Sequence, residues 1–205
     1  MNYSLIIIVL LFVAIVSLLF SLMKREAFAS SAKTIYLMGD SVLNNARYVP
    51  HKQSVEAQLR QQLSDSILRN LAEDGAKIQD LEQQLAKLDP DQMQHVVVSI
   101  GGNNILAGDA LRTMQQQMRV FLAKLRGVVP AQKVTLLQVY QPSDPTYAIY
   151  KSDIAAWNAW LTKNNDGMQV IDLMYYMQDP DDFANVEPSG QGGKKIADAL
   201  SQYLA

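Results

Sequence analysis

The chain has 205 residues, enough for one domain of ordinary size and a short additional segment. Hydrophobic residues make up 49% of the sequence and charged residues 19%, which is typical of a folded globular protein rather than a disordered one. The formal net charge of −2 shows no basic excess, so we expect no nucleic-acid partner. The absence of cysteine excludes disulfides and thiolate metal sites. The two histidines, His51 and His95, are far apart and without a ligand cluster, so we expect neither a metal nor a cofactor.

The first segment of the chain is apolar. Residues 5–23 carry no charge, and as a helix they would span roughly 28 Å, close to the hydrocarbon thickness of a bilayer. A soluble core helix would show a polar face, and this segment has none. We therefore expect an N-terminal transmembrane helix within residues 1–23, in contact with the lipid bilayer through residues 5–23. A short tether of small and polar residues follows over 24–32.

Two features bear on whether this helix is retained. Ala27-Phe28-Ala29 resembles the small-residue cleavage site of a signal peptide. A signal peptide also needs a charged segment before its apolar run, whereas here Lys24 and Arg25 follow it. An uncleaved signal-anchor is the better interpretation. The positive-inside rule then predicts a single-pass membrane protein whose domain lies on the cytoplasmic side, although two basic residues give a weak signal.

After the tether, strand-like and helix-like segments alternate. The predicted strands are residues 33–38, 66–71, 95–100, 133–140 and 168–173, and the predicted helices are residues 51–63, 77–88, 108–128, 147–163 and 192–204. Such alternation is typical of a parallel sheet with helices on both faces. The sequence therefore predicts an α/β domain over residues 33–205, a three-layer α/β/α sandwich with a five-stranded parallel sheet.

A candidate nucleophile follows the first strand, in Gly39-Asp40-Ser41. Ligands of open α/β sheets bind at the carboxyl ends of the strands, where helix N-terminal amides can stabilise an anion. Ser41 is therefore placed to attack a bound substrate. The alternative is that Asp40 and Ser41 only cap the next helix, which is the usual role of such a pair.

Three later loops carry residues that suit the same edge of the sheet. Gly75 lies in a turn after the second strand, and Gly101-Gly102-Asn103 follows the third. Glu187-Pro188 precedes the last helix. Each motif also has a structural explanation, since glycines permit positive φ and Asn residues bond their own backbone in turns.

Taken together, these four blocks resemble the SGNH (GDSL-type) hydrolase superfamily over nearly all of residues 33–205. The resemblance implies a flavodoxin-like sandwich, acyl-transfer chemistry and a small ester as substrate. It implies that Ser41 is the nucleophile. The oxyanion would be bound by the Ser41 N–H, the Gly75 N–H and the Asn103 side chain.

The last block departs from the family's Asp-x-x-His-Pro pattern. Glu187 stands where the catalytic histidine would be, and Ala184 where the aspartate would be. A serine hydroxyl needs a base, and a carboxylate becomes a serviceable one only when burial raises its pKa. Glu187 could act as a direct base, His51 could supply the base, or activity could be lost. Asp181 and Asp182 are further candidates for the missing partner.

We therefore expect a membrane-anchored serine esterase or acyl-transfer hydrolase with an altered base. The alternative is a non-catalytic ligand-binding domain tethered to a membrane. A flavodoxin-like phosphate binder is supported only by fold and by Gly101-Gly102. We expect the pocket lining to come from Asn44-Asn45, Ile105-Leu106 and residues 141–147. No long apolar lid is visible, which favours a small acyl group.

Overall fold

The structure is a computed structural model that describes residues 12–18, 20 and 33–204. It divides into two compact units, Met1–Ala32 and Lys33–Ala205, each described here by itself. In the first unit, residues 12–18 are helical. The remainder of the predicted membrane span, apart from residue 20, lies outside the described residues. Within the described part of the chain, no helix has the length and apolarity needed to cross a bilayer.

The second unit is built on a five-stranded sheet. Its strands lie in the order β2-β1-β3-β4-β5, and every pair of neighbours is parallel. The strands are β1 (Lys33–Gly39), β2 (Ser66–Asn70), β3 (Met93–Ser99), β4 (Val134–Leu137) and β5 (Gln169–Ile171). This is the flavodoxin-like order. The predicted α/β class with a five-stranded parallel sheet is confirmed.

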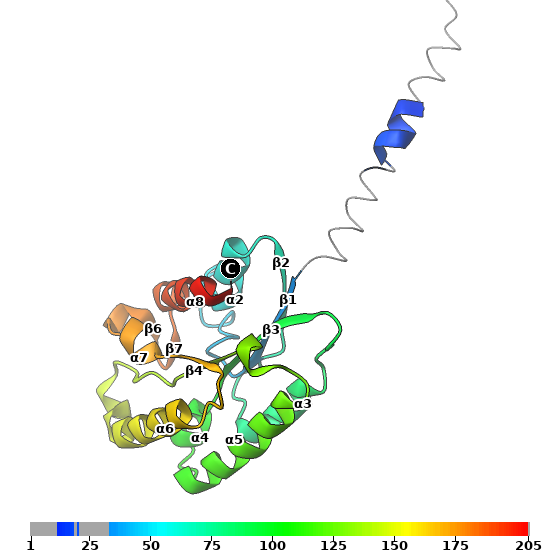
Figure 1. The fold of residues 1–205 in the computed structure, drawn as a ribbon. Coiled ribbons are helices and arrows are strands. Elements are labelled where there is room, and N and C mark those ends of the chain that lie inside the picture. Colours follow the sequence, from blue (N-terminus) through cyan, green and yellow to red (C-terminus); the bar gives the residue numbers. More distant parts are fainter. Residues whose placement is uncertain (1–11, 19, 21–32, 205) are drawn as a thin grey trace, which may run out of the picture. The chain divides into compact units, whose positions relative to one another are not determined.

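Helices cover both faces of this sheet (Figure 1). On β1, Ile35 and Leu37 enter one apolar cluster, while Tyr36 and Met38 enter the other, as alternation along a strand requires. The first cluster is closed by α2 (Val55–Gln62) and α8 (Gly190–Leu204), and the second by α3 (Leu81–Leu85), α5 (Leu111–Arg126) and α6 (Lys151–Lys163). The sheet is therefore buried on both faces.

Several short elements were not predicted. They are α4 (Gly102–Leu106), α7 (Leu173–Tyr176), an antiparallel pair β6 (Phe183–Ala184) and β7 (Glu187–Pro188), and the 3-10 turns η2 (Ala131–Lys133) and η4 (Pro180–Asp182). The helices predicted over 77–88 and 147–163 begin as the 3-10 turns η1 (Ile78–Asp80) and η3 (Pro145–Tyr150). The helix expected from residue 108 begins at Leu111, because α4 takes up the preceding loop. The helix expected from residue 51 begins at Val55, where the Ser54 hydroxyl accepts the Ala57 N–H at 3.2 Å.

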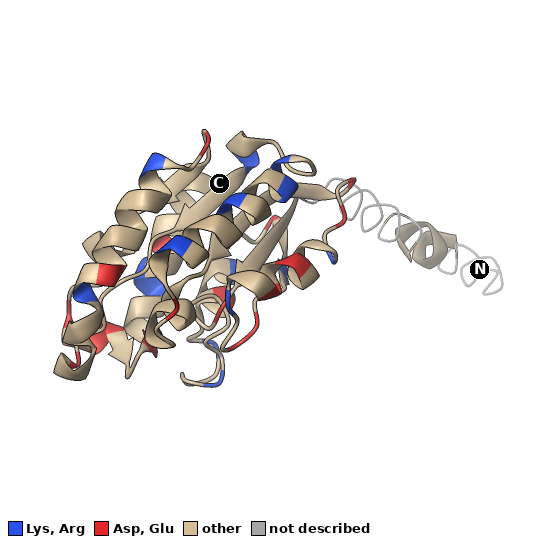
Figure 2. Cartoon of the chain, turned by 90° about the horizontal axis from the view of Figure 1, so that it is seen from below, with Lys and Arg blue, Asp and Glu red and all other residues tan. Residues whose placement is uncertain are grey.

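The order of the strands fixes where a ligand can bind. Strands β1 and β3 are neighbours, and the chain runs from β1 outward to β2 and from β3 outward to β4. In open α/β sheets, the crevice lies at the carboxyl ends of the two strands where the order reverses. Along the ribbon, Lys and Arg positions are interspersed with Asp and Glu positions (Figure 2). The end of β1 is therefore the first place to examine.

Candidate active site

The turn that carries Ser41 begins with a glycine that no other residue could replace. Gly39 has φ 123°, and a Cβ built on it would lie 1.7 Å from the Ser99 carbonyl oxygen. The Asp40 N–H donates to the same oxygen at 3.1 Å. This close approach of β1 to β3 places Ser41 directly beyond the edge of the sheet.

Asp40 then holds the turn in shape. Its carbonyl accepts the N–H groups of Leu43 and Asn44, each at 3.2 Å, and its Oδ1 accepts the Val42 N–H at 3.1 Å. The segment is a hydrogen-bonded turn and not the start of a helix, and the next helix is capped by Ser54. The helix-cap interpretation of Asp40 and Ser41 is therefore wrong. Ser41 is 7% exposed.

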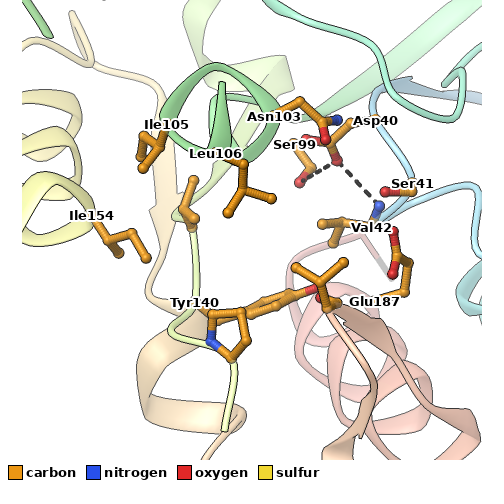
Figure 3. Close-up of a pocket in the computed structure, with 14 residues that line it drawn as sticks. Asp40, Ser41, Val42, Ser99, Asn103, Ile105, Leu106, Tyr140, Ile154 and Glu187 are labelled. Atoms are coloured by element: carbon orange, nitrogen blue, oxygen red, sulfur yellow. Dashed lines mark hydrogen bonds between the residues drawn. The ribbon is translucent and has the colours of Figure 1, made fainter. Parts of the chain in front are cut away.

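Ser41 opens onto a small pocket with an apolar far wall (Figure 3). The cavity volume is about 50 Å³, room for a few water molecules. Ser41, Asn103 and Glu187 all line it, although they come from distant parts of the sequence. The other lining residues are Asp40, Val42, Ser99, Gly102, Ile105, Leu106, Val139, Tyr140, Pro142, Ile154 and Val186.

Glu187 lies beside the nucleophile (Figure 3). Its side chain is half-buried, and burial raises the pKa of the carboxyl above its ordinary value of 4.5. Hydrogen bonding with the Ser41 side chain acts in the opposite direction and lowers this pKa, whereas the charge of Asp74 raises it further. The net shift is upward. The structure thus brings together a hydroxyl and a carboxylate whose basicity is increased.

Asp40 is a second carboxyl in the same pocket. Burial raises its pKa from 3.8 to about 7, and the nearby Glu187 adds to this rise. The Val42 N–H, the Asp40 N–H and the Ser99 hydroxyl, which lies 3.5 Å from Oδ1, lower the pKa but do not cancel the effect of burial. The sequence offered Asp40 only the alternative role of a helix cap and did not predict its place in the pocket wall.

Asn103 and Gly75, the other two residues expected to bind the oxyanion, differ in their position relative to the pocket. Asn103 lies in the pocket wall, where its Nδ2 donates to the Ala76 carbonyl at 3.0 Å. Gly75, the neighbour of Ala76 in the chain, has φ 77° and does not line the pocket. The pKa of the neighbouring Asp74 carboxyl is lowered, first by the hydrogen bond from Tyr48, then by Arg47, and least by the Gly75 backbone. The structure therefore brings Asn103 and Ser41 to one pocket, whereas Gly75 is not among the residues that line it.

The sequence model of the GDSL-like lipase/acylhydrolase family matches residues 37–193, which include every residue of this pocket. The chain belongs to this family. It is thus a member of the SGNH, or GDSL-type, hydrolase superfamily that the four blocks predict. Among curated proteins, a search finds no match.

Solved structures of GDSL proteins share the fold. A lipolytic protein of the G-D-S-L family from Veillonella parvula is 19% identical, with a TM-score of 0.67 over 83% of this chain and 97% of its own. A putative lipolytic protein from Desulfitobacterium hafniense is 18% identical, with a TM-score of 0.68 over 83% and 99%. The psychrotrophic esterase EstA from Pseudoalteromonas is 17% identical, with a TM-score of 0.63 over 84% and 96%.

This GDSL-family chain has no histidine in the pocket. His51 is exposed and lines a separate surface hollow with Lys52 and Arg60, so the structure does not bring it to Ser41. His95 lies near the amino end of β3, where its Nε2 is 2.8 Å from Thr135 Oγ1 and burial lowers its pKa to about 4. Neither histidine is in the position of a base for Ser41.

The acidic residues before Glu187 have other partners. Asp182 is fully buried and forms an ion pair with Lys195 at 2.8 Å, and it also accepts a hydrogen bond from Gln191 at 3.0 Å. Burial favours a higher pKa for Asp182, but these partners outweigh it and the pKa is lowered. Asp181 is exposed, and its carbonyl accepts the Ser189 hydroxyl. Asp182 therefore fixes the loop and is not a partner of Glu187.

The expected pocket lining is correct only in part. Ile105 and Leu106 do line the pocket, and Pro142 is the contribution of residues 141–147. Asn44 and Asn45 do not, because their side-chain amides bond the Ala72 and Pro188 carbonyls at 2.8 and 2.9 Å. In the part of the chain that the structure describes, no group of three or more His, Cys, Asp or Glu side chains could hold a metal.

Proposed function

We propose that this chain is a serine ester hydrolase of the GDSL type in which Glu187 replaces the usual histidine as the base. The observation that carries the proposal is the pairing of the Ser41 hydroxyl with the half-buried Glu187 carboxylate in one pocket. A nucleophile and its base must lie within hydrogen-bonding reach of each other, and this pairing supports the proposal. The family supports a hydrolase, and the base is inferred from the geometry.

The reaction follows from the positions of three groups. Glu187 takes the proton of the Ser41 hydroxyl as the oxygen attacks the ester carbonyl, and the resulting oxyanion accepts hydrogen bonds from the Ser41 N–H and the Asn103 amide. A donor of this kind contributes about 3 kcal/mol to transition-state stabilisation. The protonated Glu187 then gives its proton to the departing alcohol. In the second half, Glu187 takes a proton from water as the water oxygen attacks the acyl carbonyl. When the tetrahedral intermediate collapses, Glu187 returns this proton to the departing Ser41 oxygen, so that the hydroxyl is restored and the carboxylic acid is released.

The raised pKa of Glu187 is what makes a carboxylate serviceable here. A base works best when its pKa lies near the working pH, and an exposed glutamate is too weakly basic to deprotonate an alcohol efficiently. Burial shifts Glu187 in the useful direction. Since an imidazole is still the stronger base, we expect slower turnover than a Ser-His pair would give.

The pocket suits a small acyl group. A cavity of about 50 Å³ has no room for a long lipid tail. Its far wall is formed by Ile105, Leu106 and Ile154, which would bury a short alkyl group (Figure 3). We therefore propose short-chain esters as the substrate class.

We also propose that residues 5–23 anchor the protein in a membrane and are not removed. Their uncharged, apolar composition supports this proposal, and Lys24 and Arg25 support a cytoplasmic position for the domain.

Hydrolysis of 4-nitrophenyl acetate by the purified chain tests the enzyme assignment. We expect Ser41→Ala to abolish turnover and Glu187→Gln to lower kcat by about 10²-fold or more, the range of a lost general base. His51→Ala is the matched control and should leave both kcat and KM unchanged. In the wild type, kcat/KM should rise with pH as Glu187 loses its proton. If His51→Ala removes activity while Glu187→Gln keeps it, the base is wrongly assigned.

A second function, binding without hydrolysis, is favoured by one observation. One Asn103 N–H already donates to the Ala76 carbonyl, and Gly75 does not line the pocket, so two of the expected oxyanion donors are not both directed at a ligand there. A fluorophosphonate probe separates the two functions, and the monoethylphosphonate-inhibited esterase from Pseudoalteromonas supports this choice of chemistry. Labelling of Ser41 supports the enzyme. No labelling and no turnover at any pH favours the binding domain.

A further inference from the structure

The ionisable groups that line the pocket give it a single sign of charge. Among the described residues that line it, Asp40 and Glu187 are acidic and none is Lys, Arg or His. Neither carboxyl forms an ion pair with a described residue. Along the ribbon as a whole, positions of both signs occur, with Lys and Arg interspersed among Asp and Glu (Figure 2).

The nearby Arg47 does not change the negative charge of the pocket. Arg47 donates to Asp74 at 2.8 Å, and the Tyr48 hydroxyl bonds both oxygens of the same carboxylate at 2.7 and 2.8 Å. Asp74 still raises the pKa of Glu187 through its charge. The Arg47–Asp74 pair is neutral as a whole, so it supplies no positive charge to the pocket.

We propose that this site selects esters by charge, and that it accepts substrates with a positive charge two or three bonds from the ester oxygen and rejects those with a negative charge there. This inference rests on the proposed esterase function. It adds a substrate class, which is a short-chain ester of a cationic alcohol such as an amino or quaternary ammonium alcohol.

The replacement of histidine by Glu187 as the base explains why a cationic substrate would react faster. When a histidine takes the serine proton, a cation forms next to the oxyanion. When Glu187 takes that proton it becomes neutral, so the site holds a negative oxyanion and no protein cation to balance it. A cationic group on the substrate would stabilise this charge. In a partly enclosed pocket the interaction is screened less than on the open surface.

The charge state of Asp40 sets the strength of the selection. Its titratable neighbours are Glu187 and Tyr140, and the Tyr140 hydroxyl, whose pKa is raised well above 10, stays neutral. Asp40 gains its charge as the pH rises through about 7. We therefore expect the preference for a cation to increase across this range.

Three acetate esters of equal length test the proposal. Acetylcholine carries a cation, 3,3-dimethylbutyl acetate is its neutral isostere, and 3-acetoxypropanoate carries an anion at the same spacing. At low salt and above the pKa of Asp40, kcat/KM should be about tenfold higher for the cation than for the neutral ester, and about tenfold lower for the anion. High salt should bring the three values closer together.

Two variants assign the effect to the pocket. Asp40→Asn removes one charge and keeps the shape, so it should reduce the cation-to-neutral ratio above pH 7. Asp198→Asn makes the same change on an exposed carboxylate that bonds Lys194 and Gln62, and it should leave the ratio unchanged.

The outcomes are distinct from those of the proposed function. Hydrolysis of all three esters with equal kcat/KM overturns the charge selection and keeps the esterase. If no ester is hydrolysed, the esterase proposal fails. The charge selection is then tested by isothermal titration calorimetry, which compares the affinity of the site for choline with its affinity for the neutral 3,3-dimethylbutan-1-ol. Tighter binding of choline that weakens in Asp40→Asn supports it, and equal binding overturns it.

Discussion

Asp40 shows how one residue can serve the local backbone and the chemistry of the pocket together. Its Oδ1 accepts the Val42 N–H and so shapes the turn that presents Ser41. The same carboxyl is 3% exposed, and burial in a place without a cation opposes its ionisation. At neutral pH the folded protein therefore holds a carboxyl that is partly protonated beside the nucleophile.

This arrangement makes stability depend on pH. Between the unfolded pKa of 3.8 and the folded pKa of about 7, the folded protein keeps a proton that the unfolded chain has lost, so stability falls as pH rises through this range. Asp40→Asn removes the penalty while an amide oxygen still accepts the Val42 N–H. We expect the free energy of unfolding above pH 7 to rise by up to roughly 4 kcal/mol, with little change below pH 4.

Urea denaturation at several pH values measures this effect. Asp198→Asn, on the surface, is the matched control and should change stability by less than about 1 kcal/mol at any pH. If Asp40→Asn instead lowers the free energy of unfolding at high pH, the prediction is wrong, because the charged carboxylate must then be stabilised by interactions that outweigh the cost of its burial.

At this scale the sequence predicts positions better than charge states. Ser41, Asn103 and Glu187 could be placed together, because parallel strands bring their carboxyl ends to one edge. Gly75 was expected to offer its N–H to the same oxyanion, but it is not among the residues that line the pocket. The pKa of Asp40 depends on burial and on Ser99 and Glu187, which are distant from it in the sequence, and no local pattern encodes that enclosure.

The element that carries Glu187 is very small. Strands β6 and β7 have two residues each, and a hairpin of this size has little stability of its own. Two buried side chains from other parts of the domain stabilise the hairpin through hydrogen bonds to its backbone. The Tyr140 hydroxyl donates to the Val186 carbonyl at 2.7 Å, and Asn45 Nδ2 donates to the Pro188 carbonyl at 2.9 Å. Glu187 is thus fixed on both sides.

Tyr140→Phe should loosen this hold. It leaves the Val186 carbonyl without its partner, so Glu187 can move away from Ser41 and become more hydrated. We expect kcat to fall about tenfold with KM nearly unchanged, because small misplacement of a catalytic group is costly. The acid limb of the pH–rate profile should move to lower pH, since hydration lowers the pKa of Glu187. Steady-state kinetics across pH measure both effects.

Tyr36→Phe supplies the control. Tyr36 is also fully buried, and its hydroxyl accepts the Asp89 N–H at 3.2 Å away from the pocket. This variant should lose stability without moving the acid limb. If the two variants behave alike, Tyr140 has only a structural role.

Long elements were easier to predict than short ones. The repeat of apolar positions in α6 and the apolar run in β3 are long enough to identify each element. In contrast, α4 and α7 have five and four residues, too few for a helical repeat. Strand β7 includes a proline, which in sequence argues for a loop. The hairpin forms because Tyr140 and Asn45, distant in the chain, bond its backbone.

At the scale of the whole domain, the class of fold followed from the alternation of strands and helices, but the strand order did not. The order sets β1 next to β3, and this pairing joins residues about 60 positions apart, such as Gly39 and Ser99. Family resemblance supplied what periodicity could not, because the four blocks make sense only if β1 and β3 are neighbours.

The apolar run before the domain leads to the last prediction. If residues 5–23 span a bilayer, two charges near the centre of the run should prevent insertion. Leu10→Arg with Leu11→Arg places two guanidinium groups there, each costing about 2.5 to 3.5 kcal/mol at the centre of a membrane helix. We expect the protein to move from the carbonate-resistant membrane pellet to the supernatant.

The matched control, Leu10→Val with Leu11→Val, keeps the run apolar and should stay in the pellet. Protease added to intact cells tests the side of the membrane, and a cytoplasmic domain would be protected until the cells are opened. Unchanged pelleting of the arginine variant would mean that something other than this segment holds the protein at the membrane. A mature N-terminus just after Ala29 would instead show that the segment is a signal peptide, because a cleaved chain has no anchor for the arginines to disrupt.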